Sequence, residues 1–189
     1  MGNPSTNARV LLAVTVLTFV APAVAAGQEA GTRVSVEGAF GSPINVGGNS
    51  QSLSFGFSPV ERIDLLVSAE RIHMPMEVTR YERGYSATRG GTTKFISLEL
   101  RFSPFTFNRV SPYVLLGAGR GTSRPNVNDI FRDPVTNDAA LLIGGGGVRV
   151  PVTGHLSAFV DMRFVLQLEN TETGVYLFLP VRGGLAWRF

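Results

Sequence analysis

The chain ends in the stretch VYLFLPVRGGLAWRF, Val175 to Phe189, and this stretch decides the fold. Every second position is apolar or small: Val175, Leu177, Leu179, Val181, Gly183, Leu185, Trp187 and Phe189. Successive side chains of a strand point to opposite faces, so this alternation predicts a β-strand with one apolar face. The other face carries Arg182 and Arg188. The strand exceeds ten residues, about the length that crosses a bilayer at a tilt.

The same alternation recurs along the chain. It is found in the segments 32–40, 52–58, 62–71, 93–102, 112–120, 139–150 and 155–167. None of the residues on the apolar parity is charged, whereas the opposite parity carries carboxylates and arginines. In the segment 112–120 the apolar, outward set is predicted to be Tyr113, Leu115, Gly117 and Gly119.

The lengths of the connections favour a closed membrane barrel. The turns at 59–61 and 151–154 are tight, and the connections at 73–92 and 121–138 are long. Bacterial outer-membrane barrels have short periplasmic turns, longer external loops and an even number of strands. We therefore predict an all-β fold, an eight-stranded antiparallel transmembrane up-and-down β-barrel. A soluble two-sheet sandwich, which also alternates apolar and polar residues, is the alternative.

The N-terminus has the features of a cleaved secretory signal. Arg9 precedes an apolar run at 10–20, and Ala23-Val24-Ala25 forms an A-x-A cleavage site. The run is shorter than the ~20 residues that a spanning helix needs, which argues against a retained anchor helix. We predict a signal peptide at 1–26 and a barrel domain at 27–189.

Composition excludes several classes of function. The chain has no cysteine, so it offers neither disulfides nor thiolate ligands for a metal. The net charge of +3, from 17 basic and 14 acidic residues, is too small to indicate nucleic-acid binding. His73 lies beside Met74 and Met76, which are too few ligands for a metal site. We expect no metal, no cofactor and no nucleic-acid partner.

Charged residues on the opposite parity are predicted to point into the barrel. They are Glu37, Asp64, Glu70, Glu99, Arg101, Arg120, Arg149, Asp161, Arg163, Arg182 and Arg188. An eight-stranded barrel is just wide enough for side chains to fill it, and arginine pairs well with carboxylates. The set predicts either a plug of salt bridges or a candidate gate for ions, with Arg101, Arg163 and Arg182 near the constriction.

Aromatic residues on the outward parity collect at the end of the strands where the tight turns lie. They are Phe57, Phe102, Tyr113, Trp187 and Phe189. Transmembrane barrels carry such aromatic girdles at the membrane interface.

The export signal, the alternating strands, YVLLGAG at 113–119 and the terminal LAWRF together resemble the small porin-like barrels of the outer-membrane protein A and X type. The terminal Leu185, Trp187 and Phe189 resemble the signal read by the barrel-assembly machinery. The resemblance implies a location in the bacterial outer membrane, with outer-membrane lipids and lipopolysaccharide as surroundings. It implies no enzymatic activity.

Three functions follow from these patterns. The first is a structural or surface-interaction role, with membrane integrity, adhesion or defence mediated through an extracellular ligand at the loops 73–92 and 121–138. The second is a narrow gated pore for ions or small solutes. The third is lipid A modification by His155 and Ser157, because lipid A deacylases use a His and a Ser two residues apart. Against the third, the parity points both residues inward, and Ala158 replaces the Asn of those enzymes.

Overall fold

The computed structural model describes residues 33–80, 86–125, 136–169 and 175–189, and the signal peptide predicted at 1–26 lies outside them. Nine strands occupy most of the described chain. They are β1 (Arg33–Pro43), β2 (Asn49–Val60), β3 (Ile63–Arg80), β4 (Ser86–Phe102), β5 (Ser111–Pro125), β6 (Asn137–Pro151), β7 (Leu156–Glu169), β8 (Val175–Phe178) and β9 (Pro180–Arg188). Among these residues, no helix is long and apolar enough to cross a membrane.

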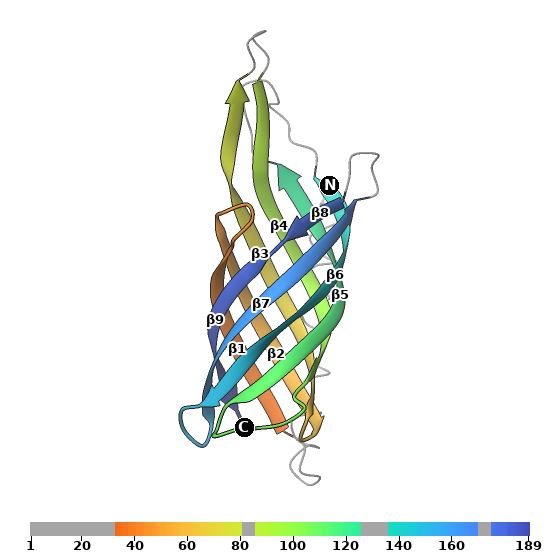
Figure 1. Ribbon diagram of the computed structural model, residues 1–189. Helices are drawn as coiled ribbons and strands as arrows, with labels where there is room; N and C mark the ends of the chain where they lie inside the picture. Colours follow the sequence, from red (N-terminus) through yellow and green to blue (C-terminus); the bar gives the residue numbers. More distant parts are fainter. Residues whose placement is uncertain (1–32, 81–85, 126–135, 170–174) are drawn as a thin grey trace, which may run out of the picture.

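The strands close into an eight-stranded antiparallel barrel (Figure 1). From β1 to β7 each strand pairs with the next, and β1 closes the ring by pairing with β9. Strands β8 and β9 both pair with β7 and form one stave that is interrupted at Leu179. The side chain of Asn45 bridges this interruption: it accepts from the Leu179 amide at 2.9 Å and donates to the Leu177 carbonyl at 2.6 Å.

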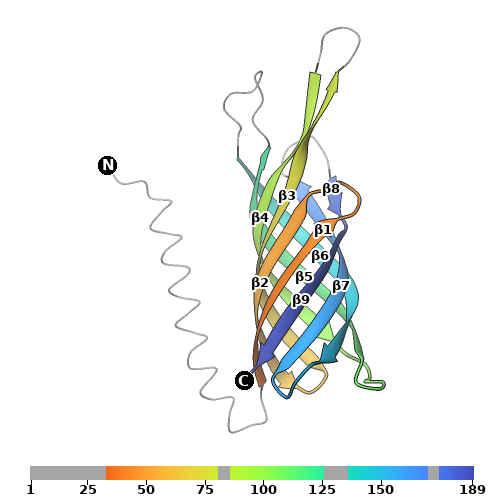
Figure 2. The same ribbon diagram turned by 90° about the vertical axis from the view of Figure 1, so that its left-hand side faces the viewer.

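The two ends of the barrel differ. At the turn end, the β2–β3 and β6–β7 turns lie near the C-terminus (Figure 1), and the Arg188 amide donates to the His155 carbonyl at 2.8 Å. At the opposite end, the hairpin end, β3 and β4 extend well beyond the other strands as a two-stranded ribbon (Figure 2). The ribbon continues the pairing after a register shift between Met74 and Glu77. The prediction of a long loop at 73–92 is therefore wrong, because most of that segment consists of paired β-strand.

The barrel is apolar on the outside. Large apolar side chains such as Leu98 and Leu116 are 62% and 65% exposed. Strands β2 to β7 and β9 each contribute at least two exposed apolar side chains to this surface, β1 contributes Phe40 and β8 contributes Leu177. An apolar surface of this extent is unusual on a protein in water. A closed barrel leaves no unpaired sheet edge, as hydrocarbon requires, so the exterior is that of a transmembrane barrel.

One strand has the opposite parity to the one predicted. Tyr113 and Leu115 of β5 are 3% and 1% exposed and point inward, and Leu115 is the register partner of the buried Arg101. Val114, Leu116 and Arg120 point outward instead. Both parities of β5 are apolar near its start, so alternation alone could not distinguish them. The inward position predicted for Arg120 and the interface position predicted for Tyr113 are both wrong.

Candidate functional site

The first charge cluster lies inside the barrel towards the turn end and consists of Glu37, Asp64, Arg101 and Arg149. Arg101 donates two hydrogen bonds of 2.8 Å to the two carboxylate oxygens of Glu37. Arg149 also pairs with Glu37, and it lies 3.3 Å from Asp64. These four residues come from β1, β3, β4 and β6, so the cluster ties together strands from different sides of the barrel.

The second charge cluster lies further along the interior and consists of Glu70, Glu99, Asp161, Arg163 and Arg182. Arg182 donates to Asp161 at 2.8 and 2.9 Å and to Glu70 at 3.0 Å. Arg163 donates to Glu99 at 2.9 Å and to Asp161 at 3.4 Å. All five side chains are buried, so water does not screen these pairs.

Tyr113 connects the two clusters. Its ring lies under the guanidinium of Arg101, with 4.6 Å from Cζ to the ring centroid, a cation–π distance. Its hydroxyl donates to Asp161 at 3.3 Å. Gly147 makes room for this contact, because a Cβ there would lie 2.8 Å from the Tyr113 hydroxyl and 2.7 Å from the Cβ of Asp161.

Serine hydroxyls hold the carboxylates from the other side. Ser50 donates to Glu70 at 2.8 Å, and Ser97 donates to Glu99 at 2.8 Å. A carboxylate that is buried in this way needs every available donor, because a buried charge is costly unless it is paired and hydrogen-bonded. Sequence reasoning missed these two serines, since serine is common on the polar face of many strands.

A cluster of buried apolar side chains, which we call the inner apolar cluster, occupies another part of the interior, beside small polar residues such as Ser68 and Thr93. Its members are Ile72, Phe95, Tyr113, Leu115, Ala139, Leu141, Ile143, Val165 and Phe178. It runs from Tyr113 along β6 and β7 to β8 near the hairpin end. These apolar side chains, the two charge clusters and the buried polar residues together fill the barrel, and water cannot reach the largest of them.

The predicted inward charges therefore fall into three groups. The two clusters contain nine of them, Glu37, Asp64, Glu70, Glu99, Arg101, Arg149, Asp161, Arg163 and Arg182. Arg188 is half-buried and, with Asp64, lines a hollow of about 180 Å³ at the turn-end mouth. Arg120 is not among them: it lies outside and pairs with Asp138 at 3.6 Å, with 81% of its side chain exposed.

Four of the predicted interface aromatics lie on the outer surface. Phe102, Trp187 and Phe189 are exposed, and Phe57 is half-buried on the same outward parity. Their strand positions place them towards the turn end. Tyr113 is the exception, for the reason given above.

His155 and Ser157 are not brought together. His155 lies in the β6–β7 turn, where its ring stacks on Trp187 at 5.8 Å, and its Nδ1 lies 3.1 Å from the Arg188 carbonyl oxygen. Ser157 is buried and faces the interior. The expectation that both point inward is wrong for His155, because the residue precedes the start of β7. A serine nucleophile needs its base within hydrogen-bond reach, so this pair has no catalytic geometry.

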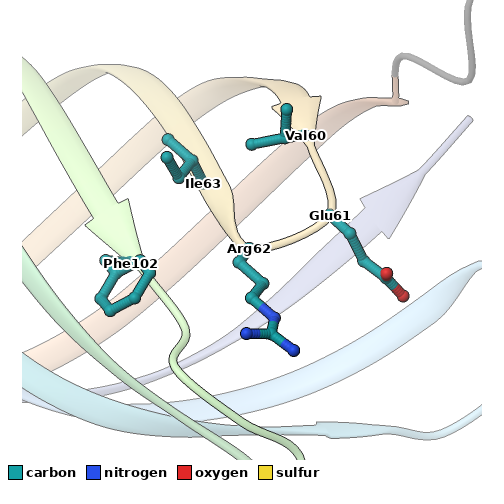
Figure 3. A pocket seen from close by; sticks show the side chains of 5 residues that line it. All are labelled: Val60, Glu61, Arg62, Ile63 and Phe102. Atoms are coloured by element: carbon teal, nitrogen blue, oxygen red, sulfur yellow. The ribbon is translucent and has the colours of Figure 1, made fainter.

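A hollow on the outer wall offers no better site. It has a volume of about 370 Å³ and is lined by Val60, Glu61, Arg62, Ile63 and Phe102 at the β2–β3 turn (Figure 3). The side chains of Ile63 and Phe102 belong to the outward parity, so the hollow does not open into the barrel. Within the described residues, no group of His, Asp and Glu could hold a metal ion.

An apolar exterior, a closed sheet and a filled, ion-paired interior define a small membrane β-barrel. Solved structures share this fold at low sequence identity. Neisserial surface protein A is 15% identical with a TM-score of 0.60, covering 84% of this chain and 96% of that one. The N-terminal β-barrel domain of Pseudomonas aeruginosa OprF is 15% identical with a TM-score of 0.57, covering 83% and 97%.

A major outer membrane protein from Thermus thermophilus is 16% identical, with a TM-score of 0.54 and coverage of 84% and 99%. No protein-family model matches the chain, and no curated protein matches it by sequence. The fold is therefore that of the small eight-stranded outer-membrane barrels, and the likeness carries no particular activity with it.

Proposed function

We propose that this protein is an integral barrel of the bacterial outer membrane with a structural and surface-interaction role, and that it is not an enzyme. The observation that carries the proposal is the filled interior. A continuous aqueous path would leave the side chains along it exposed, yet Arg101, Arg163 and Arg182 at the expected constriction are 1–2% exposed. The interactions that give the protein its function are then made by its outer surface and by the segments that extend beyond the membrane.

The proposed route to the membrane rests on two sequence motifs, the apolar run with its A-x-A site and the alternating LAWRF. The signal peptide at 1–26 directs export, and the barrel domain at 27–189 is delivered to the barrel-assembly machinery. Leu185, Trp187 and Phe189 form the recognition signal on the last strand. Lipopolysaccharide and outer-membrane lipids then surround the exposed apolar band.

A narrow gated pore is the competing function, and conductance tests it. The chain from Gly27 to Phe189 is refolded into a planar bilayer, and its insertion is checked by a heat-dependent shift in gel mobility. We expect inserted barrels to be electrically silent, because the guanidinium groups are held by carboxylates on several strands. Discrete openings that change in Arg101→Ala or Arg163→Ala would contradict the proposal and support the gate.

The β3–β4 ribbon is the proposed surface for an extracellular partner. It extends beyond the other strands (Figure 2), and the segment 73–92 is rich in arginine and tyrosine. The segment 121–138 supplies the neighbouring connection. Arginine and tyrosine suit recognition of anionic or mixed surfaces, because one offers charge and the other a rigid amphipathic ring.

A shortened ribbon tests this role. Met74 and Gly91 are register partners, so an Asn-Gly turn that replaces residues 75–90 would join them as a two-residue hairpin. Bacteria that display this variant should lose adhesion to epithelial monolayers or survival in serum relative to bacteria with the intact chain. The heat-dependent mobility shift should remain, because the removed segment lies beyond the barrel. Unchanged adhesion and survival would assign the protein a purely structural role.

A further inference from the structure

A group of cations lies on the outer wall, separate from the interior charges. The strand register brings together Arg71 of β3, Lys94 of β4, and Arg120 and Arg124 of β5. All four are exposed and share the outward parity, and Lys94 is the only lysine in the chain. We call these four residues the outer basic patch.

The patch places two positively charged side chains directly opposite each other on neighbouring strands. Arg71 and Lys94 are direct register partners on neighbouring strands. Like charges that lie directly opposite each other are unfavourable in a sheet. Among the ion pairs formed within the described residues, one involves the patch, the exposed pair between Arg120 and Asp138. Within the described part of the chain, the four cations have one carboxylate partner, which leaves most of their charge available to an external anion.

The patch also has a defined height on the barrel. Lys94 is eight residues from Phe102 on β4, which corresponds to about 27 Å along the strand at ~3.4 Å per residue. A tilt of about 40° reduces this distance to about 20 Å along the barrel axis. The exposed apolar side chains of Ile96, Leu98 and Leu100 fill the interval on the same face. The cations therefore lie just above an apolar surface of acyl-chain length.

The opposite side of the barrel has no such group. Among the described outward positions of β7, β8, β9 and β1 near the hairpin end, the side chains are apolar or uncharged, and Phe40 is 61% exposed. A general attraction of the outer surface for anions would distribute cations around the whole barrel. Their restriction to three adjacent strands indicates a site rather than a girdle.

We propose that the outer basic patch binds the phosphate groups of a lipopolysaccharide molecule whose acyl chains lie against β3–β5. This inference rests on the proposed function, which places the hairpin end in the outer leaflet. The patch spans three strands, or about 10 Å at ~4.8 Å per strand, wide enough to engage a lipid with more than one phosphate. Arginine forks and the lysine ammonium are the side chains that recognise phosphate.

Titration of the folded full barrel in dodecylmaltoside tests the site. The probes are bis-phosphorylated lipid A, the same lipid after dephosphorylation, and phosphatidylglycerol. We expect the phosphorylated lipid A to bind at least tenfold tighter than either comparison lipid. In Arg71→Gln/Lys94→Gln its affinity should fall about 25-fold, because each cation near an anionic lipid surface contributes about fivefold. Lys94→Arg keeps the charge and should retain the affinity.

The matched control removes two exposed cations at the turn end, Arg62→Gln/Arg109→Gln, and should leave the affinity unchanged. Equal loss in this control, an unaffected patch variant, or equal binding of dephosphorylated lipid A or phosphatidylglycerol would overturn the inference. In each of those cases a heat-dependent mobility shift would show that the barrel still folds, so the failure would concern the lipid site and not the proposed function. A chain that gives no heat-dependent shift and does not insert into bilayers would remove both.

Discussion

The two charge clusters and the inner apolar cluster fill the same barrel by different chemistry. In the charge clusters, each guanidinium is held in place by carboxylates from strands across the interior, as Arg101 is by Glu37. In the inner apolar cluster, residues such as Leu141 and Phe178 are held by shape alone. A charge cluster requires particular donor and acceptor atoms to lie within hydrogen-bond distance. Apolar packing accepts a substitution of similar volume at a moderate cost in stability. The comparison predicts how each region responds to truncation.

The largest loss in the free energy of unfolding is expected from Arg101→Ala. The substitution leaves Glu37 and Asp64 buried with Arg149 as their remaining partner in the first cluster, and an uncompensated buried charge costs about 3–5 kcal/mol. Urea unfolding of the refolded barrel would measure the loss. The double variant Arg101→Ala/Glu37→Ala should recover part of it, because the stranded carboxylate is gone. A double variant less stable than the single one would show that packing, not charge, dominates this cluster.

A somewhat smaller effect is expected from Leu141→Ala in the inner apolar cluster. Leu141 is 2% exposed, and truncation of a buried leucine costs about 2–5 kcal/mol through lost burial and the cavity left behind. The loss should be the same at low and high salt, because no charge is involved. If the loss of stability depended strongly on salt, the inner apolar cluster and the charge clusters would be energetically coupled. Leu141→Met, which nearly conserves volume, is the control and should cost less than about 1.5 kcal/mol.

The contact between the two regions is tested by Gly147→Ala. The added methyl group would crowd the backbone carbonyl oxygen of Val160 as well as Asp161 and the Tyr113 hydroxyl, and overpacking of this kind costs about 1–3 kcal/mol. Gly154→Ala is the matched control, since a Cβ there meets nothing within 4 Å. Thermal unfolding should separate the two alanine variants. Equal midpoints would mean that both Tyr113 and the neighbouring β7 backbone at Val160 shift without loss of stability.

The smallest effect is expected from Arg120→Ala. Its pair with Asp138 is exposed, and exposed pairs contribute about 0–1 kcal/mol. Unfolding in nonionic detergent without lipid A should therefore change little. A loss as large as that of Arg101→Ala would mean that exposure is a poor guide to the value of an ion pair in this barrel.

The sequence predicted the outer face well because lipid imposes one simple rule on it. Leu98, Leu185 and Trp187 could be placed outward without knowledge of any neighbour. The rule failed at Tyr113 and Arg120, where β5 is apolar on both parities because it faces lipid outside and the inner apolar cluster inside. It also failed beyond the membrane, where the β3–β4 ribbon pairs without an apolar face to mark it.

The partners within the charge clusters could not be predicted from sequence. Glu37 and Arg101 are 64 residues apart and meet across the barrel because of the strand stagger, which the pattern of alternation does not encode. The outer basic patch has the same origin. Its members are scattered in sequence from Arg71 to Arg124 and become neighbours through the register of β3, β4 and β5.

The seam that closes the barrel carries a proline on each strand without losing a ladder bond. Pro43 and Pro180 are register partners in the β1–β9 pairing, and neither has a backbone N–H to donate. The Ile44 amide donates to the Leu179 carbonyl at 3.0 Å just beyond this pair, and the Phe189 amide donates to the Val34 carbonyl at 2.9 Å at the turn end. Because antiparallel pairs alternate between hydrogen-bonded and non-hydrogen-bonded positions, the two prolines occupy a pair from which the ladder requires no amide. The amides of β9 should therefore exchange with deuterium no faster next to Pro180 than next to Trp187.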